Sequence, residues 1–312
     1  MIYAVWIPLL VPFVVVPAAR RLADALAPAR AVRLLAATGA GLALCTVLAL
    51  ALLVVPGAGR LPAIADAGEL VHPLGVVAPA TAVPLAATAL VLLLGCAAAL
   101  TRTVRGHWSQ LHRPARPDRG DGSELAVLRD SHPDAYALPG RPGSPGRIVV
   151  TTGMLHALAP AERDALLAHE RAHLAGHHHL YLGAAELFAR CHPALRALRA
   201  PMGYALERCA DEAAVRAVGD RRVVARAIGR AALAARSAAE PPAPRPAVAL
   251  AAAAGPVPRR VAVLLGRAAV RPRIGRAAAA TLLACAVISG AAALDASYDL
   301  HSSIEIAQGE HP

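Results

Sequence analysis

His169-Glu170-Arg171-Ala172-His173 is the stretch from which the fold of this chain can be worked out. In a helix, positions i and i+4 lie on one face, so two imidazoles at this spacing can bind one zinc ion. With 13 His and 10 Glu in 312 residues, the pattern is expected by chance roughly 0.02 times per chain. It therefore predicts a zinc helix in which Glu170 is the general base for hydrolysis, usually of a peptide bond.

The sequence around this motif predicts a long helix and a small hairpin. Residues 160–168 start with Pro, carry acidic residues early and continue with good helix formers, so the zinc helix is expected from Pro160 to about Arg190. Upstream, residues 135–138 and the β-branched residues 147–152 flank a segment rich in turn residues. They predict a β-hairpin, which either aligns an extended substrate by backbone pairing or is purely structural.

A catalytic zinc site of this kind needs a third protein ligand, and two candidates compete. Glu207 lies in a helix-compatible segment, with Asp211 one turn later to orient a ligand imidazole, although both also suit a solvated helix face. His179 completes a metzincin-like His-Glu-x-x-His-x-x-Gly-x-x-His pattern, and Met202 follows downstream. We favour Glu207, because three adjacent histidines make the spacing of His179 easy to obtain by chance. Metzincins are also largely secreted or ectodomain enzymes, whereas the charge pattern described below places this site in the cytosol.

The composition predicts an integral membrane protein. The chain is 56% hydrophobic with a mean hydropathy of +0.48, too apolar for an ordinary soluble domain of this size. Four runs nearly free of charge are long enough to cross a bilayer, and they cover residues 2–19, about 34–55, about 80–100 and about 277–294. The expected fold class is mainly α, with about four transmembrane helices and a cytosolic helical zinc-metalloprotease domain containing a small β-hairpin. The expected division is three spans in 1–100, the zinc domain in 101–276, a fourth span in 277–294 and a short extracytoplasmic tail in 295–312.

The placement of the basic residues predicts an orientation. All 32 are arginines, and they cluster in residues 20–33, 101–119 and 259–276, whereas loop 56–79 has one and tail 295–312 has none. The positive-inside rule then puts the N-terminus outside the cell membrane and the active site on its cytosolic side. Because these clusters lie at span ends, the net charge of +11 favours anionic lipid headgroups as the partner. No nucleic-acid-binding motif accompanies the charge, so direct nucleic acid binding is not expected.

The order of these features resembles the BlaR/MecR-type membrane zinc metallopeptidases, over roughly residues 125–215 and the layout of the spans. The resemblance is carried by residues 135–142, 147–155, 167–173 and 207–211. HtpX-type membrane proteases share the His-Glu-x-x-His motif, a downstream Glu-x-x-x-Asp and a cytosolic active site, and they are the competing resemblance.

The resemblance implies that His169, His173 and Glu207 bind one Zn2+, that Glu170 is the base and that Asp211 supports the ligands from outside. It further implies endoproteolysis of a cytosolic or membrane-associated protein, with a BlaI-type transcriptional repressor as the candidate substrate. The alternatives are membrane-protein quality control of the HtpX type and a non-catalytic membrane signalling scaffold with a structural zinc.

Two features of the mechanism stay open in the sequence. A donor for the oxyanion is expected, and Tyr204, His192 and Arg208 are candidates between which the sequence does not choose. Full-length β-lactam sensors of the resembled type carry a large extracellular penicillin-binding domain after the last span, whereas about 18 residues follow it here. Any inducing signal is therefore expected through the spans, loop 56–79 or a partner.

Overall fold

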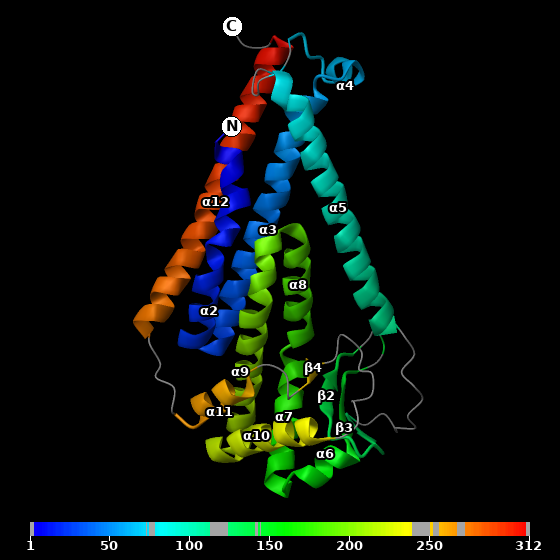
Figure 1. The fold of residues 1–312 in the computed structure, drawn as a ribbon, viewed down its shortest axis with the longest axis vertical. Helices are drawn as coiled ribbons and strands as arrows, with labels where there is room; N and C mark the ends of the chain where they lie inside the picture. Colours follow the sequence, from blue (N-terminus) through cyan, green and yellow to red (C-terminus); the bar gives the residue numbers. More distant parts are fainter. Residues whose placement is uncertain are drawn as a thin grey trace.

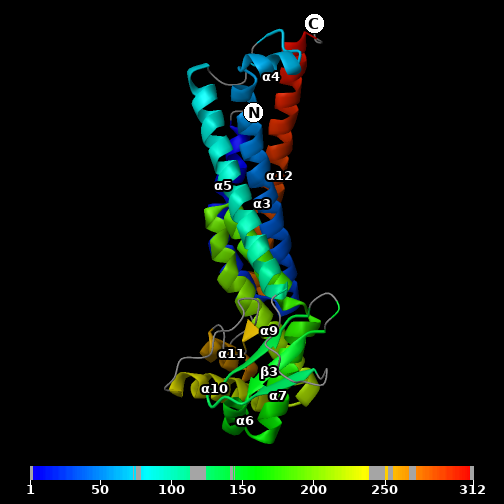
Figure 2. The ribbon, with the colours of Figure 1, turned by 90° about the vertical axis from the view of Figure 1, so that its right-hand side faces the viewer.

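A computed structural model describes residues 3–72, 74, 79–112, 124–140, 143, 145–238, 250–251, 256–266 and 272–309. Long apolar helices fill one end of the molecule, and shorter helices with a small sheet fill the other (Figures 1 and 2). The mainly helical membrane fold expected from the sequence is therefore confirmed.

Three helices are long and apolar enough to cross a membrane: α3 (Pro28–Ala58), α5 (Pro79–His112) and α12 (Pro272–Gln308). Two further parts, Ala4–Phe13 and Val15–Ala25, are bent by 48° at a break and pass the same test together, which makes four candidate spans when the bent pair is counted as one. The pair consists of η1 (Ala4–Trp6), α1 (Ile7–Leu10), η2 (Val11–Phe13) and α2 (Val15–Ala25). Pro8 and Pro12 account for the irregular first part, because proline lacks the N–H that a helix interior needs. The chain is thus a multi-pass membrane protein, as expected.

The spans differ in how much of their apolar surface the rest of the chain covers. Half of the most apolar window of α3 is buried, against 17% for α5, which leans away from the other spans (Figure 1). The short helix α4 (Pro62–Ala67) connects α3 to α5 at the end far from the sheet. Helix α12 does not end at Leu294 but continues to Gln308, where Gln308 donates a hydrogen bond to the Gly68 carbonyl at 2.8 Å. Helix α3 is therefore the centre of the bundle, and most of α5 is left for lipid.

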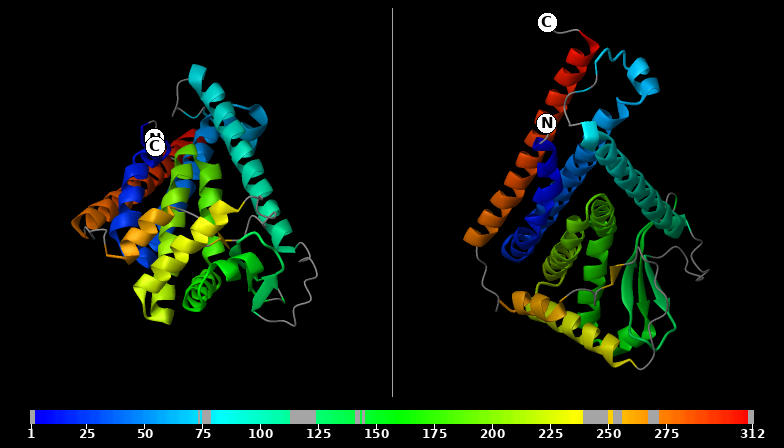
Figure 3. Two further views of the ribbon diagram at one scale, coloured as in Figure 1. Left: turned by 60° about the horizontal axis from the view of Figure 1, so that its bottom comes forward. Right: turned by 45° about the horizontal axis from the view of Figure 1, so that its top comes forward.

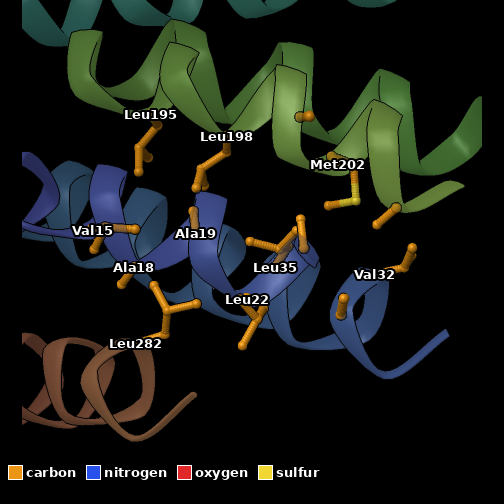
Figure 4. Close-up of a cluster of buried hydrophobic side chains, with 14 of the residues drawn as sticks. Val15, Ala18, Ala19, Leu22, Val32, Leu35, Leu195, Leu198, Met202 and Leu282 are labelled. Carbon is orange, nitrogen blue, oxygen red and sulfur yellow. The ribbon is translucent and has the colours of Figure 1, made fainter. Parts of the chain in front are cut away.

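A helical hairpin from the zinc-site end of the molecule inserts into the span bundle. It consists of α8 (His178–Cys191), η3 (Pro193–Leu198) and α9 (Arg199–Val218), and it rises beside α3 (Figure 1). Leu195, Leu198 and Met202 from the hairpin pack against side chains of α2, α3 and α12 in one apolar cluster (Figure 4). At the hairpin tip, His192 Nε2 lies 3.0 Å from the Leu9 carbonyl oxygen. The zinc-site unit and the spans are thus built around a shared core.

The sheet lies beside the helices at the other end of the molecule (Figure 3). Its strands are β1 (Leu125–Leu128), β2 (Ala135–Leu138), β3 (Arg147–Thr151) and β4 (Leu250–Ala251), in the order β1-β3-β2-β4. Strands β2 and β3 form the expected antiparallel hairpin, while β1 joins β3 in parallel and β4 joins β2 antiparallel. The remaining helices are α6 (Thr152–Ala157), α7 (Pro160–Ala175), α10 (Arg221–Ser237) and α11 (Val257–Leu264). The predicted hairpin is therefore part of a larger sheet.

The prediction of one long zinc helix from Pro160 to about Arg190 is wrong. Helix α7 ends at Ala175, Gly176 follows, and His177 adopts the left-handed conformation with φ 48° and ψ 40° before α8 begins. Glycine weakens a helix, and a left-handed residue cannot continue a right-handed one. The break separates the two helices: α7 lies beside the sheet, and α8 continues into the span bundle (Figure 1).

Candidate metal centre

The helix that carries the His-Glu-x-x-His motif is fixed firmly at its start. Glu162, in the first turn of α7, accepts a hydrogen bond from the Ala159 N–H at 3.0 Å and another from Arg230 of α10 at 2.8 Å. Burial disfavours its charge, but these hydrogen bonds outweigh that cost and lower the pKa of the Glu162 carboxyl. A carboxylate near a helix N-terminus is favoured, so Glu162 stabilises the start of α7. Its hydrogen bond from Arg230 also joins α7 to α10.

Two packed helices bring the predicted metal-binding side chains together. Helix α7 supplies His169 and His173, and α9 supplies Glu207; all three are buried. The two Nε2 atoms lie 3.1 Å apart, and the Glu207 carboxylate oxygens lie 3.6 Å from His169 Nε2 and 3.5 Å from His173 Nε2. One ligand atom from each residue lies within 4.8 Å of the other two. Two imidazole nitrogens and one carboxylate converging in this way fit a catalytic zinc, which uses three protein ligands and keeps one position open.

A second set of contacts surrounds these ligands. Asp211, one turn after Glu207, has its Oδ1 atom 3.1 Å from His169 Nδ1. Arg260 of α11 is fully buried and reaches Asp211 through Nε at 2.8 Å and Nη2 at 2.5 Å. Its Nη1 atom lies 2.6 Å from Glu207 Oε2. Three helices therefore meet in one buried ionic network.

The charges of this network control each other. Burial disfavours a positive charge on His169, but Asp211 and Glu207 outweigh it and raise the pKa of its imidazole to about 9. Burial likewise opposes the charges of Asp211 and Arg260, yet their mutual hydrogen bonds lower the pKa of Asp211 and raise that of Arg260. The negative charges of Asp211 and Glu207 therefore favour a cation at this centre, and the positive charge of Arg260 compensates part of them.

Glu170 lies in the same centre without any of these contacts. It is fully buried, and among the residues that the structure describes neither of its carboxylate oxygens has a hydrogen-bond partner. Burial raises the pKa of the Glu170 carboxyl to about 8. A buried carboxylate without partners is costly in a purely structural role, and its placement next to His169 in the motif suits a functional one.

The three adjacent histidines have separate surroundings. His179 is not in the metal-ligating group found among the described residues, and its ring faces His177 at 6.1 Å between centroids. Met202, which the metzincin-like alternative needed near the metal, is packed in the span cluster instead. The geometry thus favours Glu207 over His179. His178 is the buried one, with its Nδ1 atom 2.8 Å from His173 Nδ1, and burial lowers the pKa of its imidazole to about 4.

Two of the expected oxyanion donors are engaged elsewhere. Arg208 donates to the carbonyl oxygens of Ala23 at 2.6 Å and Leu26 at 3.1 Å, at the end of α2. His192 lies at the hairpin tip, among the spans. Tyr204, one turn before Glu207, remains a candidate, with the Arg259 guanidinium 4.8 Å from its ring centroid.

Arg260 is the member of the centre that sequence reasoning missed. The sequence placed it only in the arginine cluster of residues 259–276, beside a membrane span. Its signal in the sequence is weak, because an arginine pair in an Ala-rich stretch of a chain with 32 arginines looks like one more basic cluster. In the structure, Arg259 forms an ion pair with Asp24 of α2, while its neighbour Arg260 faces the zinc ligands.

Comparison with known proteins agrees with this geometry. The sequence pattern of Peptidase family M48 matches residues 97–268, which is more than half of the 312-residue chain. The chain belongs to Peptidase family M48. The match covers all three helices of the metal centre, so this member of M48 is a membrane-embedded zinc metalloendopeptidase. No match was found among curated proteins or among solved structures.

Proposed function

We propose that His169, His173 and Glu207 hold the zinc ion and that Glu170 is the general base of peptide-bond hydrolysis. The zinc ion, when bound, supplies Lewis acidity that polarises the scissile carbonyl and acidifies the attacking water. Glu170 takes a proton from that water and later passes it to the leaving amine. The observation that carries this assignment is the buried Glu170 carboxylate, whose two oxygens have no partner among the described residues.

The remaining members of the network position the ligands. Asp211 Oδ1 lies 3.1 Å from His169 Nδ1, on the side of the ring away from the Nε2 atom that is directed toward Glu207, and a carboxylate at this place supports the orientation of the ring. Arg260 contacts the carboxylates of both Glu207 and Asp211 and offsets their repulsion. Both residues act through the ligands and touch no substrate.

Two variants in detergent test the assignment. Glu170→Gln should keep stoichiometric zinc and lose about 10²- to 10⁴-fold in peptide cleavage, because it removes the proton acceptor but no ligand. Glu207→Ala should lose zinc, while His179→Ala should keep both zinc and activity. Cleavage by Glu170→Gln at the wild-type rate, or loss of zinc from His179→Ala alone, would contradict the proposal.

We also propose that the zinc centre faces the cytosol, with the N-terminus and the end of α12 outside, and that residues 101–276 form the cytosolic unit. The described parts of these arginine clusters, residues 20–33, 101–112, 259–266 and 272–276, lie on α11 and at the ends of α2, α3, α5 and α12 that are turned toward the sheet (Figure 1), which supports this orientation. A reporter that is active only outside the cytosol, fused after Pro312, should be active. Activity of that reporter in residues 113–123 instead would reverse the orientation.

We further propose that the protein is a regulatory protease of the BlaR type and that its substrate is a BlaI-type repressor. The support is the resemblance in residues 135–142, 147–155, 167–173 and 207–211. Purified protein should cut such a repressor at one site, and Glu170→Gln should bind it without cutting. Cleavage of an unfolded membrane protein with the repressor left intact would favour HtpX-type quality control. Zinc binding with no cleavage of either would favour a signalling scaffold.

A further inference from the structure

His178 contacts a proposed zinc ligand, His173, and no role has been assigned to it above. It is the first residue of α8 and is 6% exposed, whereas His177 is exposed. After the break at Gly176 and His177, the side chain of His178 lies against His173 in the last turns of α7. There its ring meets the ring of His173 edge to face, with centroids 4.8 Å apart.

The positions of the ring nitrogens decide which histidine donates and which accepts the hydrogen bond between them. His173 Nε2 faces His169 and Glu207, so its lone pair belongs to the metal side and its proton must sit on Nδ1. That Nδ1 lies 2.8 Å from His178 Nδ1. Because two nitrogens at this distance need one donor and one acceptor, His173 donates and His178 accepts. His178 therefore carries its own proton on Nε2.

Each proposed imidazole ligand thus has its own partner behind it. Asp211 stands behind His169, and His178 stands behind His173. Partners of this kind fix the tautomer and the orientation of a ligand ring. The two partners differ, because Asp211 brings a negative charge while the imidazole of His178 brings only a lone pair.

Gly176 supports the same conclusion independently. Its φ of −84° is available to any residue, so its backbone does not require glycine. A Cβ atom at this position would lie 2.5 Å from His178 Nε2 and 2.6 Å from His178 Cδ2. The absence of a side chain at Gly176 is therefore what lets the His178 ring lie where it reaches His173.

We propose that His178 is a positioning residue that holds His173 for the metal by accepting its Nδ1–H. This inference rests on the proposed zinc ligands. Those are tested first with His173→Ala, which should lose zinc; if it keeps wild-type zinc, the proposed function fails before His178 is considered.

The test of His178 compares variants by zinc affinity and by the visible spectrum of the cobalt-substituted protein. His178→Leu fills the space without an acceptor and should weaken zinc binding about 10- to 100-fold and shift the spectrum. His178→Asn offers an amide oxygen near the position of Nδ1 and should restore most of the affinity. His179→Leu, a matched change one residue away, should leave both measurements unchanged.

Gly176→Ala provides a second approach that keeps His178 itself. The added methyl group should displace the ring and weaken zinc binding in the same direction as His178→Leu. It also covers the case in which His178→Leu fails to fold. The inference is overturned if His178→Leu keeps the wild-type zinc affinity and cobalt spectrum. If His178→Leu does not fold, the same result in Gly176→Ala overturns it. Equal losses in His178→Asn and His178→Leu would do so as well.

Discussion

The two halves of α9 lie in opposite environments, although no break separates them. Before Glu207, the helix presents Met202 and Leu206 to the apolar cluster of the spans, both at most 1% exposed. From Glu207 onward, the buried side chains include the carboxylates of Glu207 and Asp211, which face imidazoles and a guanidinium, beside the small side chains of Ala210 and Ala214 and the Arg208 guanidinium. The apolar core and the ionic centre thus meet at neighbouring residues of one helix, Leu206 and Glu207.

This difference shows that two kinds of interaction hold one helix in place. Apolar packing is not directional and tolerates exchanges that preserve volume. A buried ionic network is stable only while each charge keeps its partner, because a lone buried charge is costly. Changes in the apolar half should therefore alter stability alone, whereas changes in the ionic half should alter both stability and zinc binding.

The largest effect is expected from Arg260→Met, which leaves Asp211 and Glu207 buried without their guanidinium. Removing one partner of a buried ion pair costs about 3–5 kcal/mol. Urea unfolding in detergent with a chelator present should show this loss. Arg260→Lys keeps the charge but not the bidentate geometry, so its stability should lie between that of the wild type and that of Arg260→Met. An unchanged unfolding midpoint in Arg260→Met would mean that the network does not stabilise α9.

The next largest effect is expected in the apolar half of the structure. Leu198→Ala removes a side chain that is 1% exposed and packs near Gly39, and the cavity should cost about 3 kcal/mol (Figure 4). Zinc affinity should stay at the wild-type value, because no ligand contact changes. Leu180→Ala is the matched control, since Leu180 is 60% exposed and its truncation should be nearly neutral in stability. Leu198 ends η3, directly before α9, so a parallel fall of zinc affinity and stability in Leu198→Ala would show that the apolar cluster and the ionic half of α9 do not act separately.

The sequence predicted the parts of this comparison that depend on local pattern. The i, i+4 spacing of His169 and His173 is a property of one helix, and Glu207 with Asp211 repeats that spacing on another. The four apolar runs were visible because membrane spans need uninterrupted apolar length. Such features survive in a sequence because they do not depend on which other segments pack against them.

The missed features depend on tertiary contacts. Arg260 joins the centre from a helix about 50 residues after Asp211, and nothing in its local sequence separates it from the arginines at span ends. The break after α7 was missed because Gly176 and three histidines are compatible with a continuing helix. The break accompanies a close approach of His178 to His173, a tertiary contact that no periodicity records.

A smaller effect should show whether an ion pair needs burial to contribute to stability. Glu162→Gln removes a charge that is 4% exposed and bonded to Ala159 and Arg230, so it should cost about 1–2 kcal/mol at neutral pH. Because folding lowers the pKa of Glu162, its contribution is present above the ordinary value of about 4.5 and is lost as the pH falls toward the lowered value. The difference in unfolding free energy between the two proteins should therefore shrink on acidification.

Glu124→Gln is the matched control for that measurement. Glu124 pairs with Arg171 at 3.2 Å, and both side chains are about half exposed. An exposed pair contributes little, so the change should cost well under 1 kcal/mol at any pH. Equal costs in Glu162→Gln and Glu124→Gln would show that the burial of Glu162 has no energetic consequence.

The smallest effect is expected at His177, where α7 and α8 part and the chain leaves the ionic centre for the span bundle. Its φ of 48° is left-handed, which costs an L-residue about 1 kcal/mol, so His177→Gly should stabilise the protein by about 0.5 kcal/mol after the entropy of the unfolded chain is counted. Gly219→Ala makes the reverse change at φ 82°, after α9, and should destabilise by about 1 kcal/mol. Zinc affinity should not change in His177→Gly, because glycine keeps the break and leaves His178 against His173. Weaker zinc binding in that variant would mean that the ring of His177, and not only its backbone, holds the turn that brings His178 to the metal centre.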